Sequence, residues 1–185
     1  AVAGEDYNAA SGQVVIPAGQ MSGTITVLVN GDTKDEDNES FMVNLSAPVN
    51  ATLATSSVIG TIMNDDQAPT ISVGGAEVLE GQSGTSALEF PVQLSEISGK
   101  DITVEYSTAD GTATAGEDYE SAAGVLTIPA GQASGTIVVT VNGDTDEEET
   151  ENLTATLASP YNATLGAATA TGLIINDDFP PSEAN

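Results

Sequence analysis

The sequence contains no cysteine, no histidine and no tryptophan, and only three phenylalanines and four tyrosines. Without cysteine it forms no disulfide and offers no thiolate to a metal or a substrate. Without histidine it lacks the side chain that most often serves as a general base. Paired carboxylates can hydrolyse glycosides, but so few aromatic side chains provide little surface for stacking a sugar ring. We therefore expect a binding or structural protein and not an enzyme.

Basic residues are almost absent as well, because Lys34 and Lys100 stand against 28 acidic residues and leave a net charge of −26. This charge repels nucleic acids and anionic lipids, and it attracts cations. No apolar run approaches the roughly 20 residues of a membrane-spanning helix, so we expect no membrane insertion. Acidic chains poor in aromatics are often disordered, but 39% hydrophobic residues in regular alternation favour a folded protein.

Many of the acidic residues belong to a long internal repeat. Ala3–Tyr7 returns as Ala115–Tyr119, and Asn64–Asp66 returns as Asn176–Asp178, both at a spacing of 112 residues (115 − 3 and 176 − 64). Solenoid repeats span only roughly 20 to 50 residues. A period of this length therefore indicates tandem domains.

The second copy has the sequence pattern of a β-sandwich. Apolar residues take every second position in short runs, for example Ile102, Val104 and Tyr106, which is the period of a half-buried strand. Turn residues such as Pro129 and Gly131 separate the runs. This pattern favours an all-β fold, an immunoglobulin-like antiparallel β-sandwich of about seven strands. The expected strands are Thr70–Val73, Ala87–Leu94, Ile102–Ser107, Val125–Ile128, Thr136–Val141, Leu153–Leu157 and Ala168–Ile175.

We expect three parts: the C-terminal part of a first sandwich at residues 1–66, a complete second sandwich at residues 67–178, and the start of a linker to a further domain at residues 179–185. The first copy has no counterpart of Pro69–Thr112 and keeps strand-like runs around Val14, Ile25, Val43 and Ile59. So few strands do not close a two-layer core. We expect residues 1–66 to be poorly ordered or to self-associate, completing their sandwich between chains.

Six of the eight residues in the segment Asp144–Glu151 are acidic. Two unit charges 4 Å apart repel by about 1 kcal/mol even in water, so a folded loop this dense needs counterions. Ca²⁺ supplies them, because it takes roughly six to eight oxygen ligands in flexible geometry. The alternative is a solvated acidic loop that aids solubility. Cation binding is favoured by the register of the repeat, in which Asp32, Glu36 and Glu39 match Asp144, Glu148 and Glu151.

Several short sequence motifs follow one another along the second copy: Gly111–Ala113, Gly116–Tyr119, Pro129–Gly131, Asp144 with Glu148 and Glu151, Pro160, and Ile175–Asp178. Together they resemble the Calx-β domain, which occurs in sodium–calcium exchangers, in an integrin subunit and in large bacterial surface proteins. No single element is diagnostic, but their order is specific. The resemblance covers the second copy and the surviving part of the first, and it implies a β-sandwich with a calcium site.

The resemblance also implies which residues hold calcium. In the second copy they are Glu80, Asp118, Asp144, Asp146, Glu148, Glu151, Asp177 and Asp178. In the first copy they are Asp6, Asp32, Glu36, Glu39, Asp65 and Asp66. Asn176 replaces the first Asp of the family's terminal run. Lys34 interrupts the first copy at the position of Asp146, so we expect a weaker site there.

Two functions fit such a module. The first is a structural part of a larger, bacterial extracellular or cell-surface protein such as an adhesin, in which calcium at the interdomain pole stiffens neighbouring domains. The second is a calcium sensor that signals to an attached domain, as the resemblance to the exchangers implies. Affinity separates them, since extracellular modules bind at about 10⁻⁴ to 10⁻³ M and sensors at about 10⁻⁷ to 10⁻⁵ M. The Ala-, Thr- and Gly-rich tandem sequence favours the first.

Overall fold

The computed structural model describes residues 1–178, and the regular secondary structure of these residues consists of β-strands alone. The chain divides into two compact units, unit 1 (Ala1–Asp66) and unit 2 (Gln67–Asn185). Residues 179–185, expected to begin a linker, lie outside the described residues. Among residues 1–178 there is no helix that is both long and apolar enough to cross a membrane. The expected all-β class is confirmed.

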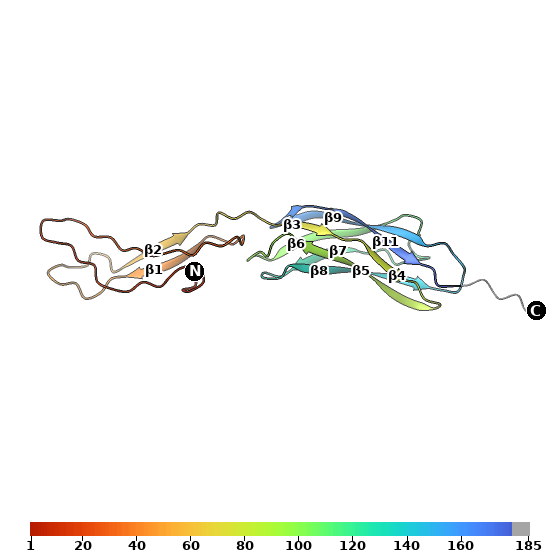
Figure 1. Cartoon of the computed structure of the whole chain (residues 1–185), viewed down its shortest axis with the longest axis horizontal. Helices are drawn as coiled ribbons and strands as arrows, with labels where there is room; N and C mark the ends of the chain where they lie inside the picture. Colours follow the sequence, from red (N-terminus) through yellow and green to blue (C-terminus); the bar gives the residue numbers. More distant parts are fainter. Residues whose placement is uncertain (179–185) are drawn as a thin grey trace, which may run out of the picture. The chain divides into compact units, whose positions relative to one another are not determined.

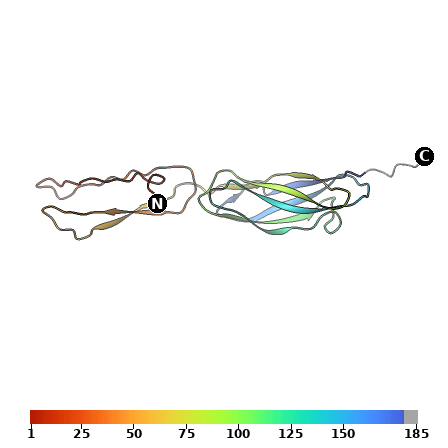
Figure 2. The same cartoon turned by 90° about the horizontal axis from the view of Figure 1, so that it is seen from below.

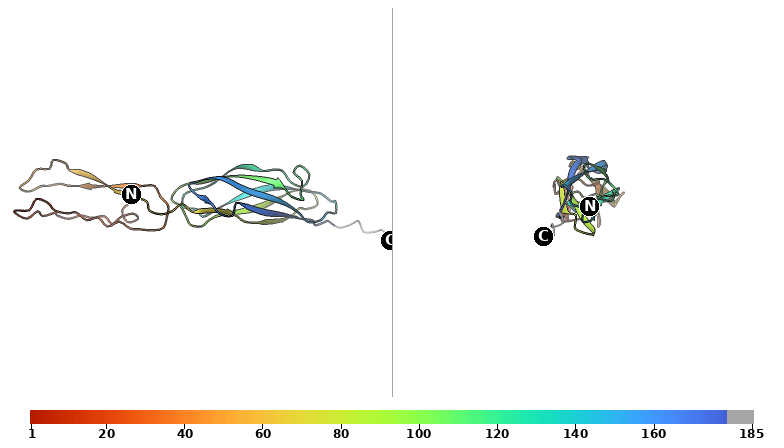
Figure 3. Two further views of the ribbon diagram at one scale, coloured as in Figure 1. Left: turned by 90° about the horizontal axis from the view of Figure 1, so that it is seen from above. Right: turned by 90° about the vertical axis from the view of Figure 1, so that its right-hand side faces the viewer.

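Unit 2 is a sandwich of two sheets, whose strands are seen in Figures 1 and 2 and in two further views in Figure 3. One sheet has the strand order β10-β3-β5-β8 and the other the order β4-β11-β9-β6-β7. The pairs β10·β3 and β11·β4 are parallel and the others are antiparallel. The strands are β3 (Thr70–Val73), β4 (Ala76–Leu79), β5 (Gly84–Leu94), β6 (Ile102–Asp110), β7 (Ala123–Ile128), β8 (Ser134–Gly143), β9 (Glu151–Tyr161), β10 (Thr164–Leu165) and β11 (Thr169–Ile175).

The hydrophobic core of unit 2 lies between the sheets, because alternating apolar residues send one face of each strand inward. Leu88, Phe90 and Val92 of β5 are fully buried. Each such side chain contributes roughly 1.5–3 kcal/mol through its burial. The Phe90 ring packs over Gly172 of β11, where an added Cβ would lie 2.5 Å from a ring atom. Gly172 therefore lets the ring of one sheet reach the backbone of the other.

All seven strands expected in the second copy are present, most of them longer than the alternation indicated. β5, for example, begins at Gly84 and not at Ala87. Two strands were not expected, β4 with four residues and β10 with two. Both lie at a sheet edge and pair in parallel. Runs this short carry too little alternation to be recognised in the sequence.

Unit 1 contains two strands, β1 (Glu39–Asn44) and β2 (Ser57–Ile62), which pair antiparallel. Glu39 lies opposite Ile62, as Glu151 lies opposite Ile174 in the pair β9·β11. Glu151 lies 112 residues after Glu39, and Ile174 lies 112 residues after Ile62, which is the repeat spacing. The pair β1·β2 is therefore the structural repeat of β9·β11, and the internal repeat extends to the register of the backbone.

The expectation of strands around Val14 and Ile25 was wrong, since neither run is a strand in unit 1 (Figure 1). Their counterparts in unit 2 are β7 and β8, which pair with β6 and β5. Unit 1 has no counterpart of β5 or β6, so these runs find no strand to pair with. The turn between them is kept, because the Gln20 N–H donates to the Pro17 carbonyl at 3.0 Å.

Candidate metal centre

Glu80, Asp177 and Asp178 come together at one end of the unit 2 sandwich. Glu80 directly follows β4, and the two aspartates follow β11 after Asn176. The strands β4 and β11 are parallel neighbours, so the chain leaves both at the same edge. One carboxylate oxygen from each of the three residues lies within 4.8 Å of the other two. These residues form the Glu80 group.

Two members of the Glu80 group are buried, with Glu80 4% and Asp178 8% exposed. Glu80 Oε1 and Asp178 Oδ2 are buried oxygens that have no hydrogen-bond partner. Asp177 Oδ1, by contrast, accepts the backbone N–H of Gly81 at 3.1 Å. An ionised carboxylate that loses its hydration without gaining a donor is destabilising. The buried oxygens therefore lack the kind of partner that a cation provides.

Burial and neighbouring charges change the acidity of the Glu80 group. Burial raises the pKa of Glu80 from the ordinary value of 4.5 to about 7, and the charges of Asp144 and Glu148 add to the effect. Burial also raises the pKa of Asp178, with a further contribution from Asp177. Desolvation and like charges both disfavour the ionised carboxylate. Without a cation, Glu80 and Asp178 therefore keep their protons to a higher pH than exposed carboxyl groups do.

A second group consists of Asp118, Glu148 and Glu151, whose carboxylate oxygens again lie within 4.8 Å of one another. Asp118 lies in the turn before the buried Tyr119, and its Oδ2 accepts the backbone N–H of Thr114 at 2.6 Å. Glu151 is the first residue of β9, and Glu148 precedes it in the acidic loop. These three residues form the Asp118 group.

The Asp118 group is also short of hydrogen-bond donors. Glu151 Oε2 is buried and has no hydrogen-bond partner. Burial raises the pKa of Glu151 to about 7, and a hydrogen bond shared with Asp118 raises it further in the same direction. Desolvation and the charges of Asp118 and Asp144 raise the pKa of Glu148. Both groups therefore concentrate carboxylates that are difficult to ionise without a counterion.

The two groups are electrostatically coupled, because the charges of each act on the other. Glu148 raises the pKa of Glu80, and Glu80 raises the pKa of Glu151. Asp144 acts on both groups, and its Oδ1 accepts the backbone N–H of Asp146 at 2.8 Å. The Glu80 group, the Asp118 group and Asp144 are together called the acidic centre. Asp146 is exposed and belongs to neither group, although its charge raises the pKa of Glu148.

The oxygen atoms of the acidic centre suit a hard cation. They are carboxylate oxygens from four separate segments of unit 2, and three of them are buried without a hydrogen-bond partner. Ca²⁺ prefers oxygen ligands and tolerates irregular arrangements, whereas Mg²⁺ requires nearly ideal octahedral geometry. Ligands drawn from several segments suit the more tolerant ion, so the residues present fit calcium.

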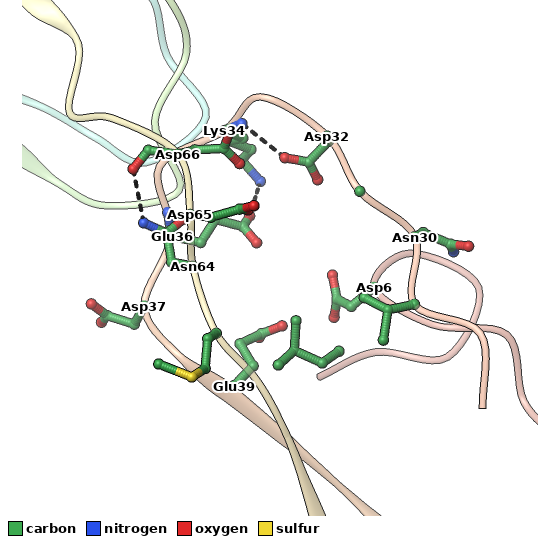
Figure 4. Close-up of a pocket in the computed structure, with 14 residues that line it drawn as sticks. Asp6, Asn30, Asp32, Lys34, Glu36, Asp37, Glu39, Asn64, Asp65 and Asp66 are labelled. Atoms are coloured by element: carbon green, nitrogen blue, oxygen red, sulfur yellow. Dashed lines mark hydrogen bonds and ion pairs between the residues drawn. The ribbon is translucent and has the colours of Figure 1, made fainter. Parts of the chain in front are cut away.

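Unit 1 has a smaller counterpart in which oxygens of Asp6, Glu36 and Glu39 lie within 4.8 Å of one another. These residues line a pocket of about 90 Å³ together with the other carboxylates expected in the first copy, Asp32, Asp65 and Asp66. Figure 4 shows Asp6 and Glu39 pointing toward one another. A hydrogen bond from the backbone of Val2 lowers the pKa of Asp6, and a hydrogen bond with Asp6 raises that of Glu39. The structure thus gathers all six first-copy residues.

Lys34 places a positive charge in the unit 1 pocket, beside Asp32 and Glu36 (Figure 4). Its Nζ lies 2.6 Å from Glu36 Oε1, and this hydrogen-bonded ion pair raises the pKa of Lys34. The equivalent position in unit 2 is Asp146. The ammonium group therefore neutralises part of the negative charge available to a cation in unit 1.

The sequence pattern did not reveal the residues that position these carboxylates. Asn176 was taken as a replaced ligand, yet its Oδ1 accepts the backbone N–H of Asp178 at 3.1 Å and fixes the loop after β11. In unit 1, Asn64 holds Glu36 and Asp66 through their backbone atoms. Gly143 is a further example, because β8 approaches the Glu80 segment closely there. All three recur in the repeat, which was the available signal.

Comparison with known proteins relates the chain to one family. The model of the Calx-beta domain matches residues 1–67 and 64–178. The extracellular matrix organizing protein FRAS1 of Mus musculus is 29% identical over an alignment 185 residues long, which covers 94% of this chain and 5% of FRAS1. The chain thus spans only a small part of that relative.

Two solved structures show the likeness in three dimensions. The crystal structure of the apo-form Calx CBD1 domain is 27% identical with a TM-score of 0.52, and the match covers 60% of this chain and 100% of that one. The crystal structure of the calcium binding domain CBD12 of CALX1.1 is 29% identical with a TM-score of 0.53, covering 58% of this chain and 46% of that one.

Proposed function

The chain belongs to the Calx-beta domain family, and we propose that it is a calcium-binding module whose acidic centre in unit 2 holds the ions. The observation that carries this proposal is the set of three buried carboxylate oxygens without hydrogen-bond partners, on Glu80, Glu151 and Asp178. A solvated acidic loop would turn its carboxylates toward water. These three are sheltered from water beside other carboxylates, an arrangement that a cation stabilises.

The proposed ligands come from both groups and the loop between them. In unit 2 they are Glu80, Asp118, Asp144, Glu148, Glu151, Asp177 and Asp178, with Asp146 adding charge beside them. In unit 1 they are Asp6, Glu36 and Glu39, surrounded by Asp32, Asp65 and Asp66. Binding in unit 1 is weaker, because Lys34 neutralises Glu36 there.

Calcium at these positions would stiffen the segments that follow the last strand of each unit. Asp65 and Asp66 follow β2 in unit 1, and Asp177 and Asp178 follow β11 in unit 2. A cation shared between these aspartates and other carboxylates of the same unit ties the segment after the strand to the rest of that unit. This favours a structural role in a larger extracellular or cell-surface protein, and the match to an extracellular matrix organizing protein supports it. The Lys-poor, Ala-, Thr- and Gly-rich sequence fits a bacterial one.

A calcium-sensing role is the second candidate. It is favoured by the likeness to the calcium binding domain CBD12 of CALX1.1. In that case the same acidic centre would change occupancy at cellular calcium concentrations and alter an attached domain. No catalytic step is part of either proposal, and both describe a binding module.

Calorimetric titration of the full chain with calcium tests the proposal and separates its two forms. A structural module binds with a dissociation constant of about 10⁻⁴ to 10⁻³ M, and a sensor with one of about 10⁻⁷ to 10⁻⁵ M. The matched control is the double variant Glu80→Gln, Glu151→Gln, which keeps the side-chain shape but can no longer ionise at these two positions. Absence of saturable binding in the unmodified chain would refute calcium binding altogether.

A further inference from the structure

The turn that carries Asp118 is attached to the end of strand β8. Tyr119 forms an isolated antiparallel bridge with Val141 of this strand. The next residue of β8, Asn142, makes two hydrogen bonds to the turn. Its backbone N–H donates to the Asp118 carbonyl at 2.9 Å, and its side-chain Nδ2 donates to the Glu117 carbonyl at 2.7 Å. Asn142 therefore holds the backbone on both sides of the Asp118 side chain.

These two hydrogen bonds fix the direction of the Asp118 side chain. The Glu117 carbonyl belongs to the peptide group before the Asp118 Cα, and the Asp118 carbonyl belongs to the peptide group after it. Because peptide groups are planar, holding both of them fixes the two backbone dihedral angles between them, and with these the direction of the Cα–Cβ bond. The Asp118 carboxylate is held in turn by the backbone N–H of Thr114, which donates to Oδ2. One residue of β8 thus sets where this carboxylate lies.

Only the side-chain hydrogen bond depends on asparagine at position 142. Any residue except proline supplies the backbone N–H, but a second donor from the same residue requires a short side chain with an N–H group. Asparagine is otherwise depleted in strands. Asn142 is nevertheless a residue of β8, half-buried and directly after the fully buried Val141. Residues that conflict with their local structure in this way are expected at functional sites.

The same two hydrogen bonds occur in unit 1. Asn30, the equivalent of Asn142, donates its backbone N–H to the Asp6 carbonyl at 2.9 Å and its Nδ2 to the Glu5 carbonyl at 2.8 Å. Asp6 is again a member of a group of carboxylates. Residues 22–31 are not a strand, so the contact does not depend on the ladder in which β8 takes part. In both units the asparagine accompanies the carboxylate.

We infer that Asn142 is a positioning residue for calcium binding, which acts on the Asp118 group through the Glu117 carbonyl. The inference rests on the proposed function, because calcium is the ion for which Asp118 is positioned. Without the side-chain hydrogen bond, the turn keeps its backbone bond to β8, but the peptide group before Asp118 gains freedom. Calcium must then order this group when it binds, and the cost of ordering lowers its affinity.

The adjacent residue of β8 contacts the other group of the acidic centre. An added Cβ at Gly143 would lie 2.0 Å from the carbonyl oxygen of Gly81, which follows Glu80. General loosening at the end of β8 would therefore disturb both groups of carboxylates. The loss of the Asn142 side-chain hydrogen bond acts on the Asp118 group, so the response of the two groups separates a positioning role from a merely structural one.

The test compares Asn142→Ala with the matched control Asn30→Ala in the full chain. Calcium titrations are followed by NMR at the Thr114 amide, which donates to the Asp118 group, and at the Gly81 amide, which donates to the Glu80 group. Asn142→Ala is expected to raise the calcium midpoint at Thr114 by about five- to tenfold, the size of one net hydrogen bond, and that at Gly81 by less than about threefold. Asn30→Ala, which changes unit 1, is expected to leave both midpoints unchanged.

A second variant, Asn142→Asp, distinguishes positioning from the overall electrostatic field. It keeps the shape of the side chain, removes the donor and adds a negative charge near the acidic centre. A diffuse acidic field would then bind calcium more tightly. The positioning role predicts weaker binding at Thr114, because a carboxylate repels the Glu117 carbonyl and does not hold it.

Amide exchange at Thr114 in calcium-free buffer measures how firmly Asp118 is held, apart from calcium. Asn142→Ala is expected to speed this exchange by at least about threefold and to leave exchange at Gly81 unchanged. The inference is overturned by equal changes of both midpoints in Asn142→Ala, by tighter binding in Asn142→Asp, or by unchanged exchange at Thr114. Absence of calcium-dependent shifts in the unmodified chain would instead refute the proposed function, and the exchange rates would still decide whether Asn142 holds Asp118.

Discussion

An added Cβ at Gly143 would lie 2.0 Å from the carbonyl oxygen of Gly81, the residue that follows Glu80. Such a distance cannot be accommodated, and β8 is held in place by its ladder with β5, so Gly143→Ala must displace the Glu80 segment. We expect the variant to weaken calcium binding by roughly tenfold or more and to lose about 1–3 kcal/mol of stability through overpacking. Calorimetric titration and thermal melting measure the two effects.

Gly31→Ala is the matched control, because an added Cβ at this equivalent position in unit 1 meets nothing within 4 Å. It is expected to leave calcium binding by unit 2 unchanged. If Gly143→Ala bound calcium as tightly as Gly31→Ala, then Glu80 would not depend on the approach of β8.

Glu148 and its neighbour Glu147 provide a second matched pair. A carboxylate oxygen of Glu148 lies within 4.8 Å of carboxylate oxygens of Asp118 and Glu151, whereas Glu147 is exposed and belongs to neither group. We expect Glu148→Gln to weaken calcium binding more than about tenfold, a loss of about 1.4 kcal/mol, and Glu147→Gln to weaken it much less. Equal losses in the titrations of both variants would mean that the loop acts as a diffuse acidic field.

The raised pKa values of Glu80 and Glu151, about 7 against 4.5, predict an unusual pH dependence in calcium-free buffer. The folded protein binds more protons than the unfolded one between these values, so stability is highest below about pH 4.5 and falls as the pH rises through 7. We expect a higher melting temperature at pH 5.5 than at pH 8. The variant with both glutamates changed to Gln is expected to flatten this difference.

Saturating calcium is expected to reverse the trend, since the ion binds the ionised carboxylates and its binding releases protons. Titrations in buffers of different ionisation enthalpy measure the number released. A melting temperature that rises with pH in calcium-free buffer would contradict the protonation of Glu80 and Glu151.

Lys34 is predicted to limit the site of unit 1. Lys34→Gln removes the ammonium that lies 2.6 Å from Glu36 Oε1 and frees that carboxylate for a cation. Because an exposed ion pair contributes only about 0–1 kcal/mol, the gain in affinity is expected to be no more than about fivefold. Calcium-dependent NMR shifts of the Asp6 and Asp65 amides measure it. Lys100→Gln, which removes the other lysine, is the control and should leave these shifts unchanged.

The fold of unit 2 was predictable because its strands alternate strictly, as in Leu153, Ala155 and Leu157 of β9. Strands β4 and β10 were missed because their parallel pairing depends on distant partners and not on their own short sequences. Around Val14 and Ile25 the same alternation predicted strands that are not formed. Alternation indicates which side of a strand can be buried, but a strand also requires a neighbour for its backbone.

The set of acidic residues was predictable from the repeat, since each first-copy member has a counterpart at a fixed spacing. Its division into the Glu80 group and the Asp118 group was not, because it depends on the parallel neighbours β4 and β11 bringing Glu80 to Asp177. Nor does sequence reveal which oxygens are buried without donors. The roles of Gly143 and Asn176 depend likewise on backbone distances that only the folded chain defines.

The central claim is that the acidic centre requires calcium, and thermal melting of the full chain in calcium and in chelator tests it most directly. At about 100 times its dissociation constant calcium adds roughly 2.7 kcal/mol per site, which raises the melting temperature of a chain of this size by at least about 5 °C. Sodium chloride at matched ionic strength should restore little of this difference. Superimposable melting curves in calcium and chelator would contradict the claim.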